Sequence, residues 1–269
     1  MRNIKKDFTT VPLSLKEQSE KLKNVTSNTP LKYDGEDVKI ALFDLYHGKC
    51  AYCEQLSNLE IEHYRPKEAY FWLKIEWTNL LYSCHDCNRV GSKGALFPTL
   101  KDKISTPELT TNGFPTHKHT YIYELDKIEQ PLLLNPEVTN PYYHLRIDKF
   151  GKLIEIDNSR KGKETSIVCR LNRDALHRKR AKIINDFINR IQQQIAKRYR
   201  EVNPLNAEQL KEQLFLIFED IAKQGNELME FTMISYSFIQ YFDDMVLDNF
   251  EPEFHDIILT AFIEFCENV

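Results

Sequence analysis

Two pairs of cysteines have the spacing of a metal site. Cys50 and Cys53 form one Cys-x2-Cys pair, Cys84 and Cys87 form a second, and thirty residues separate the two pairs. Each such turn directs two thiolates toward one point, and two turns complete the tetrahedral, all-sulfur shell of structural zinc. The alternatives are a redox site, which needs a single pair in a βαβ setting, and four unrelated buried thiols. The repeated spacing therefore predicts one structural Zn²⁺ held by all four cysteines.

Polar residues of a second kind lie between and just after the two pairs. Glu62 and His63 are adjacent, Asn79 precedes the second pair, and Asn88 and Lys93 follow it. The order Cys-x2-Cys, Glu-His, Asn, Cys-x2-Cys-Asn resembles the HNH (ββα-metal) nuclease family in its zinc-containing form. The resemblance covers about fifty residues and implies a ββα-metal core that hydrolyses phosphodiester bonds.

Phosphodiester hydrolysis explains why these residue types occur together. The reaction needs a base that deprotonates water, and stabilisation of charge on the phosphate and on the leaving oxygen. A neutral histidine such as His63 can be that base at physiological pH. The resemblance implies that Glu62 and Asn88 ligate a catalytic Mg²⁺ or Mn²⁺, and that Asn79 fixes the loop that carries the base. Many HNH sites have Asp in place of Glu62, whose longer side chain must still reach the ion.

Basic residues near this group are the expected contacts to the nucleic-acid substrate. They are Arg65, Lys67, Arg89 and Lys93. His85 lies inside the second cysteine pair, but Asn88 matches the third position of the HNH motif better.

A longer set of segments narrows the resemblance. Residues 50–54, 62–67, 76–81 and 133–136 look like PtuB, the family of HNH subunits in Septu anti-phage systems, which is also found with some retrons. Membership would imply a PtuA-like ABC/SMC-type ATPase as partner, and in retron systems a reverse transcriptase with its nucleic acid. The chain contains no G-x4-G-K-[ST] loop among its eight glycines, so ATP dependence would come from the partner.

Three competing functions follow. The first is a metal-dependent endonuclease that cleaves DNA as the nuclease subunit of an ATPase–nuclease defence complex. The second is an effector of the same type that cleaves tRNA or another RNA. The third is a non-catalytic, zinc-containing adaptor that binds nucleic acid or the ATPase.

The periodicity of apolar residues predicts the elements around this group. Residues 36–47 have helical periodicity that Gly48 ends, and alternation over 145–156 predicts a β-hairpin. Asn172 is the expected N-cap of a helix whose buried stripe is Ile183, Phe187, Ile191 and Ile195. Further helices are expected from Asn206 to near Gly225, over about 227–247, and from Pro252.

These elements predict an α+β fold class, with a zinc-stapled ββα-metal HNH nuclease core followed by a mostly α-helical C-terminal bundle. Four segments are expected. Residues 1–34 form an N-terminal arm that could dock the partner, residues 35–105 form the nuclease core, residues 106–168 form a loop and β-hairpin extension, and residues 169–269 form the helical domain.

Charge is unevenly distributed over a chain of ordinary composition. The apolar fraction is 42%, the charged fraction is 28% and the net charge is -4, which excludes wholesale disorder and a membrane bundle. Residues 170–200 carry ten basic and two acidic side chains, whereas residues 201–269 carry two basic and fifteen acidic ones. The basic stretch predicts either a phosphate-facing surface or a helix docked on acidic neighbours. Without a secretory signal or an apolar run, we expect a cytoplasmic protein with no membrane association.

Overall fold

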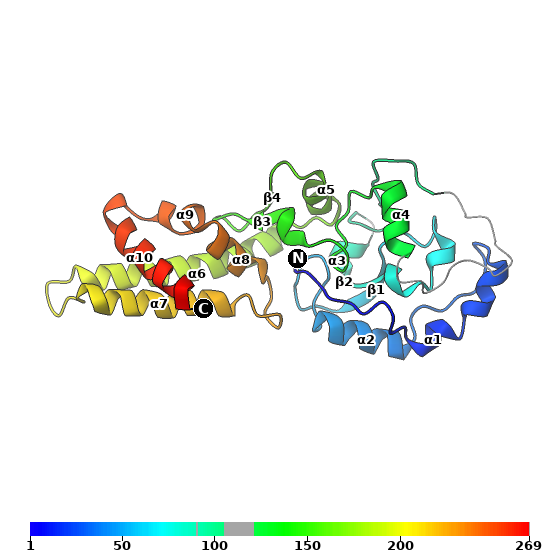
Figure 1. Ribbon diagram of the computed structural model, residues 1–269, viewed down its shortest axis with the longest axis horizontal. Helices are drawn as coiled ribbons and strands as arrows, with labels where there is room; N and C mark the ends of the chain where they lie inside the picture. The colour runs from blue at the N-terminus through cyan, green and yellow to red at the C-terminus, as the bar shows by residue number, and fades with distance from the viewer. Residues whose placement is uncertain (90, 105–120, 269) are drawn as a thin grey trace. The chain divides into compact units, whose positions relative to one another are not determined.

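The computed structural model describes residues 1–89, 91–104 and 121–268 (Figure 1). The fold is α+β, and the chain divides into two compact units. Unit 1 comprises Met1–His144 and Glu155–Leu171, and unit 2 comprises Leu145–Ile154 and Asn172–Val269. The division into four segments expected from the sequence stays a prediction.

Unit 1 contains a two-stranded sheet and mostly short helices. The strands are β1 (Leu59–His63) and β2 (Leu80–Cys84), and the helices are α1 (Leu13–Lys16), α2 (Glu36–Tyr46), α3 (His85–Asn88), α4 (Tyr121–Glu129) and α5 (Arg160–Val168). Four 3-10 turns, Ser19–Asn24, Phe71–Leu73, Trp77–Asn79 and Pro141–Tyr143, complete the unit within the described residues.

The order β1, β2, α3 brings the two cysteine pairs and the polar group together. The strands pair antiparallel, with Leu59 opposite Cys84 and His63 opposite Leu80, and α3 follows β2 without a break. The connection between the strands is held by buried aromatic side chains, of which Trp72 and Trp77 are the largest. The end of β1 and the start of α3 therefore belong to one small hairpin-and-helix frame.

The predicted helix over 36–47 is confirmed as α2. His47 and Gly48 both have positive φ (52° and 66°), so the helix ends in left-handed backbone, which glycine adopts without strain. Its buried face consists of Val38, Leu42 and Tyr46.

The N-terminal arm is a built-in part of unit 1. Met1, Ile4, Leu15 and Leu22 are buried, and the amide of Ile4 donates to Pro136 O at 2.8 Å. The side chain of Lys6 is also buried, and its Nζ donates to the carbonyls of residues 77 and 80 at 2.8 and 2.6 Å. These side chains of the arm are therefore packed inside unit 1, and docking of a partner on the arm stays a prediction.

Two helices, α4 and α5, lie in the segment 106–168, for which a loop and a β-hairpin were expected. Helix α4 buries Ile122 and Leu125, and α5 is capped by Ser159, whose Oγ accepts from Gly162 N at 3.1 Å. Their sequences are rich in charged and β-branched residues, which weakens the helical periodicity that would have revealed them. The centre of that loop, residues 105–120, lies outside the described residues.

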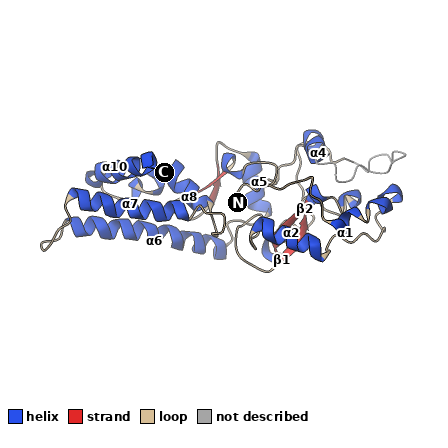
Figure 2. Cartoon of the chain, turned by 60° about the horizontal axis from the view of Figure 1, so that its bottom comes forward, coloured by secondary structure: helices blue, strands red, loops and turns tan. Residues whose placement is uncertain are grey.

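Unit 2 consists of a small hairpin and a group of helices. The hairpin strands β3 (Leu145–Ile147) and β4 (Leu153–Glu155) confirm the predicted hairpin, although Glu155 itself is assigned to unit 1. The helices are α6 (Asp174–Arg198), α7 (Ala207–Lys223), α8 (Met233–Gln240), α9 (Phe242–Met245) and α10 (Pro252–Asn268), with a 3-10 turn at Leu247–Asn249. Helices α6 and α7 lie side by side, and α10 packs on α7 (Figure 2).

Two predicted helix starts are confirmed. Asn206 caps α7 in a complete capping box with Gln209, and Pro252 is the first residue of α10. The predicted cap at Asn172 is wrong, because its side chain instead exchanges two hydrogen bonds with the backbone of Leu153.

Two other details of the helical unit differ from expectation. The buried stripe of α6 contains Ile184 rather than Ile183. The single helix expected over 227–247 begins only at Met233, because Asn226 Oδ1 accepts from Leu228 N at 2.9 Å and Phe231 has a φ of 56°. Non-helical backbone at Tyr241 (φ -127°, ψ 46°) then separates α8 from α9. A side-chain-stabilised turn and left-handed backbone stop helix growth before Met233.

Candidate functional site

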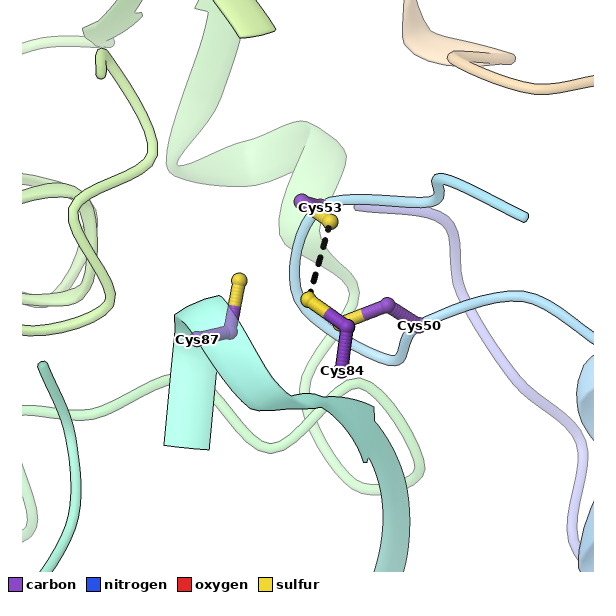
Figure 3. A group of neighbouring side chains, drawn as sticks. All are labelled: Cys50, Cys53, Cys84 and Cys87. Atoms are coloured by element: carbon purple, nitrogen blue, oxygen red, sulfur yellow. Dashed lines mark hydrogen bonds between the residues drawn. The ribbon is translucent and has the colours of Figure 1, made fainter. Parts of the chain in front are cut away.

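The four predicted zinc ligands converge on one point. Cys50 and Cys53 lie in the loop before β1, Cys84 ends β2, and Cys87 lies in α3 (Figure 3). All four are buried and their sulfur atoms lie within 4.8 Å of one another, with Cys53 Sγ and Cys84 Sγ 3.8 Å apart. A tetrahedral zinc with Zn–S bonds of about 2.3 Å separates its sulfurs by about 3.8 Å. The cluster therefore fits one tetrahedral ion.

Backbone hydrogen bonds hold the first cysteine turn against the second. Within the turn, Glu54 N donates to Cys50 O at 2.9 Å and Cys50 N donates to Gln55 O at 3.1 Å. Ala51 N donates to Tyr82 O at 2.8 Å, which ties the turn to β2 near Cys84. Hydrogen bonds from the neighbouring thiols lower the pKa of Cys84, whereas burial raises the pKa of Cys50.

His63 lies at the end of β1 as a buried, neutral imidazole. Its Nε2 lies 3.0 Å from Lys74 O, and its ring packs edge-on against Tyr33 at 4.5 Å between centroids. Because a carbonyl can only accept, Nε2 carries the hydrogen and Nδ1 keeps its lone pair. Burial, aided by the charges of nearby lysines, lowers the pKa of His63 to about 3. The ring is therefore neutral at physiological pH, and Nδ1 keeps an unprotonated lone pair.

Asn79 fixes the backbone that follows His63. Its Oδ1 accepts from Arg65 N at 2.8 Å, and its Nδ2 donates to Arg65 O at 3.0 Å and to Leu73 O at 3.3 Å. The side chain is buried, so these bonds form away from water. Asn79 thus clamps the segment two residues after His63.

Glu62 is buried next to a buried lysine. Its Oε1 forms an ion pair with Lys93 Nζ, and the same ammonium donates to His63 O at 2.9 Å. Burial raises the pKa of Glu62 to about 7, although the charge of Lys93 opposes the increase. Lys93 therefore orients both the Glu62 carboxylate and the end of β1.

The predicted site residues of strand β1 and helix α3 line one cavity. It has a volume of about 330 Å³ and is lined by Glu62, His63, Lys67, Asn88 and Arg89, among others. Lys67 Nζ donates to Tyr33 OH at 2.8 Å, and Arg89 is exposed at the mouth. A carboxylate, a neutral imidazole, a carboxamide and two cations thus face a common space.

Two of the predicted substrate contacts, Arg65 and Lys93, are buried and are not among the residues that line this cavity. Arg65 is 1% exposed, and its guanidinium donates to Glu129 Oε2 at 2.8 Å and to Asp126 Oδ1 at 2.7 Å. Lys93 is fully buried in the Glu62 ion pair. The burial of both cations argues against the contact to nucleic acid that the sequence predicted for them, because their charges are neutralised inside the unit.

Sequence reasoning missed two neighbours of the site. Glu60 accepts from Asn88 Nδ2 at 3.2 Å and from Arg89 NH2 at 3.2 Å, and so holds two of the side chains that line the cavity. Its position two residues before Glu62 on a strand was the available signal, because alternate strand residues share a face. Tyr33, which contacts His63 and Lys67, had no such signal since it lies far away in the sequence.

Comparison with curated proteins finds similarity over a little more than half of the chain. A Septu protein PtuB from Bacillus mycoides (strain KBAB4) is 33% identical over 175 residues, which are 58% of this chain and 53% of the relative. The chain is similar to PtuB. A second PtuB, from Bacillus thuringiensis, is 38% identical over 79 residues, 28% of this chain and 30% of that protein.

A third relative has a different name. The Septu protein PtuA of Bacillus mycoides (strain KBAB4) is 29% identical over 164 residues, 54% of this chain and 20% of that protein. The chain thus spans about half the length, or less, of the curated relatives that it matches. No family model matches the sequence. None of the helices within the described residues has the length and apolar character needed to cross a membrane.

Proposed function

We propose that the chain is a metal-dependent HNH endonuclease that hydrolyses phosphodiester bonds of nucleic acid, DNA in the first place. The observation that carries the proposal is the shared cavity, on which β1 and α3 present Glu62, His63 and Asn88 beside a four-cysteine cluster. The order β1, β2, α3 has the strand and helix sequence of a ββα-metal core.

His63 is the general base in this proposal. Its Nε2–H is held by Lys74 O, so Nδ1 can accept a proton from the attacking water. The low pKa of the buried ring keeps it unprotonated at neutral pH, and Asn79 holds the following backbone in place. The hydrogen bond at Nε2 and the clamp by Asn79 would orient the base before substrate binds.

The residues on the cavity also suit a hard divalent cation. Glu62 and Asn88 offer a carboxylate and a carboxamide oxygen, and Asn88 uses its Nδ2, not its oxygen, to bind Glu60. Mg²⁺ and Mn²⁺ prefer such ligands and often keep only one or two protein oxygens. When bound there, the ion would supply charge stabilisation for the phosphate and the leaving oxygen. Lys67 and Arg89 at the cavity would contact neighbouring phosphates.

The four-cysteine cluster has a separate role in the proposal. Zn²⁺ in a closed all-sulfur shell has no open position for substrate, so the ion would hold β2 and α3 together rather than take part in hydrolysis. Two metals with different ligands, one sulfur-bound and one oxygen-bound, are therefore expected.

The similarity to PtuB supports a place in anti-phage defence. We infer that the chain works with a PtuA-like ATPase of the ABC/SMC type, which would hold and control the nuclease. A reverse transcriptase with its nucleic acid would be a further partner if the system includes a retron.

The decisive experiment compares two histidine variants. The purified chain, alone and with its ATPase partner, is incubated with plasmid DNA or bulk tRNA in Mg²⁺ or Mn²⁺. His63→Ala should abolish cleavage while retaining zinc and the folded state. His85→Ala is the matched control, because this histidine is exposed beside the cluster and forms no part of the cavity lining.

Each outcome separates the competing functions. Cleavage of plasmid that His63→Ala abolishes supports the DNA nuclease, and the same result with tRNA alone supports the RNA effector. Equal cleavage by wild type and His63→Ala would refute the assignment of the base. A folded, zinc-loaded wild type that binds nucleic acid or the ATPase and never cleaves would favour the adaptor.

A further inference from the structure

The basic helix α6 uses its charges in two different ways. Toward its C-terminal half, Arg190 NH2 pairs with Asp220 on α7 at 2.7 Å. Arg180 is buried, and its Nε donates to Gly151 O at 2.7 Å in the hairpin turn. By contrast, Arg178, Lys179 and Lys182 are exposed and have no ion-pair partner within the described residues. The acidic C-terminal region thus neutralises part of the helix and leaves its first turns positive.

The hairpin turn adds two more side chains to this positive surface. Gly151 (φ 85°) lies so close to α6 that a Cβ there would meet Ala181 N at 2.6 Å, and His177 Nε2 lies 2.7 Å from Phe150 O. These contacts fix the turn on the helix beside Arg178 and Lys182. Phe150 is 63% exposed, and the side chain of Lys152 is exposed as well.

Counter-charges around this surface are few. Asp174 is the one acidic residue between positions 170 and 185 of the sequence. In the turn, Asp148 accepts from the backbone amides of Phe150 and Lys152, and Lys149 is paired with Asp248. The next acid along α6 is Asp186, one turn after Lys182.

We propose that Phe150, Lys152, Arg178 and Lys182 form a second nucleic-acid contact on unit 2, separate from the cavity of unit 1. Cations without acidic partners bind a phosphate backbone at low desolvation cost, and an exposed ring beside them can stack on an unpaired base. An acidic protein segment would use the same cations, and the competition with poly-glutamate described below separates it from nucleic acid. The surface would hold substrate outside the catalytic cavity, and in this respect the inference rests on the proposed function.

The test measures binding and not cleavage, so it stays informative if the nuclease proposal fails. Fluorescent 30-nucleotide single-stranded DNA, the matching duplex and tRNA are titrated with the full-length chain, without added divalent metal, between low and moderate salt. The variant Arg178→Glu/Lys182→Glu should weaken binding at least tenfold at low salt. It should also reduce the slope of log affinity against log salt by about one for each cation removed.

Matched variants separate the surface from net charge. Arg200→Glu/Lys223→Glu makes the same change in charge at two other exposed positions of unit 2 and should alter affinity by less than twofold. Phe150→Ala should weaken the affinity for single-stranded DNA about fivefold or more and leave the affinity for duplex DNA nearly unchanged.

Three results would overturn the proposal. One is an unchanged affinity and salt slope in Arg178→Glu/Lys182→Glu, and another is an equal loss in the control pair. The third is competition by poly-glutamate as strong as that by nucleic acid of equal charge, together with no effect of Phe150→Ala, which would assign the surface to an acidic protein. Each variant is first shown to unfold at the wild-type temperature. If His63→Ala retains binding while Arg178→Glu/Lys182→Glu loses it, the two sites are distinguished regardless of whether cleavage is observed.

Discussion

Asn79 offers the sharpest test of how the frame holds the proposed base. Its side chain makes three hydrogen bonds to backbone atoms, two to Arg65 and one to Leu73, and all are buried. Asn79→Ala would remove all three and leave the amide and carbonyl of Arg65 without these partners. The backbone after His63 would then be free to move, although the imidazole itself would be unchanged.

The size of the effect follows from the number of bonds. A buried hydrogen bond contributes about 1 kcal/mol net, and a buried backbone group left unsatisfied costs about 1–3 kcal/mol. Asn79→Ala should therefore lower the free energy of unfolding by about 3 kcal/mol. For a protein of this size that corresponds to a decrease in melting temperature of about 6–12 °C. A displacement of the base by about 1 Å can reduce turnover on the order of a hundredfold.

The control is Asn135→Ala. Asn135 is also buried in unit 1, but its Oδ1 accepts from Glu137 N at 3.0 Å, away from His63. Thermal unfolding gives the stability of both variants, and plasmid or tRNA cleavage is measured at a temperature at which both are folded. Asn79→Ala should lose at least tenfold in cleavage rate, whereas Asn135→Ala should stay within about twofold of wild type. If Asn79→Ala lowers the free energy of unfolding by less than about 1 kcal/mol, the clamp is refuted. If it loses the full ~3 kcal/mol and still cleaves at the wild-type rate, the clamp stabilises the fold but does not position the base.

Three further predictions concern the cluster and the ion pairs. Cys84→Ser should reduce the zinc content from one ion per chain to none by elemental analysis, whereas the buried Cys169→Ser should keep it; equal zinc in both would contradict the assigned ligands. Lys6→Met and Glu137→Gln should each destabilise by about 3–5 kcal/mol in denaturant unfolding, because each removes the counter-charge of a buried ion, and the double variant should cost clearly less than the sum. Asp220→Asn should cost at most ~1 kcal/mol at pH 7. The Arg190 hydrogen bond lowers the pKa of Asp220, so its contribution is present above the pKa of the unfolded chain and lost as pH falls through that of the folded chain. The two proteins should therefore converge in stability in acid, and a constant difference would exclude this origin.

The parts of the fold that the sequence predicted correctly are those with a local signal. The cysteine pairs converge as expected because each turn is short and fixes its own geometry. The ends of α2 and the start of α7 follow from residues that act on their neighbours, Gly48 and the Asn206–Gln209 capping box. The late start of α8, at Met233, also has a local cause, the turn at Asn226, but apolar periodicity across 227–247 concealed it.

The parts that were missed depend on contacts between distant segments. Arg65 carries no mark in the sequence that distinguishes a buried cation from a surface one, and its partners Asp126 and Glu129 lie in α4, a helix that was not expected. The arm over 1–34 gave the impression of a separate segment because its contacts, such as those of Lys6 with residues 77, 80 and 137, join positions far apart in the chain. A single sequence contains the charges but not their pairing.

Lys93 shows why the cluster and the cavity should be considered as one mechanical unit. Its amide donates to Cys87 O at 3.1 Å, and the next amide, Gly94 N, donates to Asn88 O at 2.6 Å. The turn that leaves the second cysteine pair is thereby fixed, and it directs the Lys93 ammonium to His63 O and to the Glu62 carboxylate. An ion that holds Cys84 and Cys87 would also hold the end of β2, the position of Asn88 and the origin of this turn. Lys93, which the sequence predicted as a contact for phosphate, thus connects the turn after the four thiols to the proposed base and metal ligand.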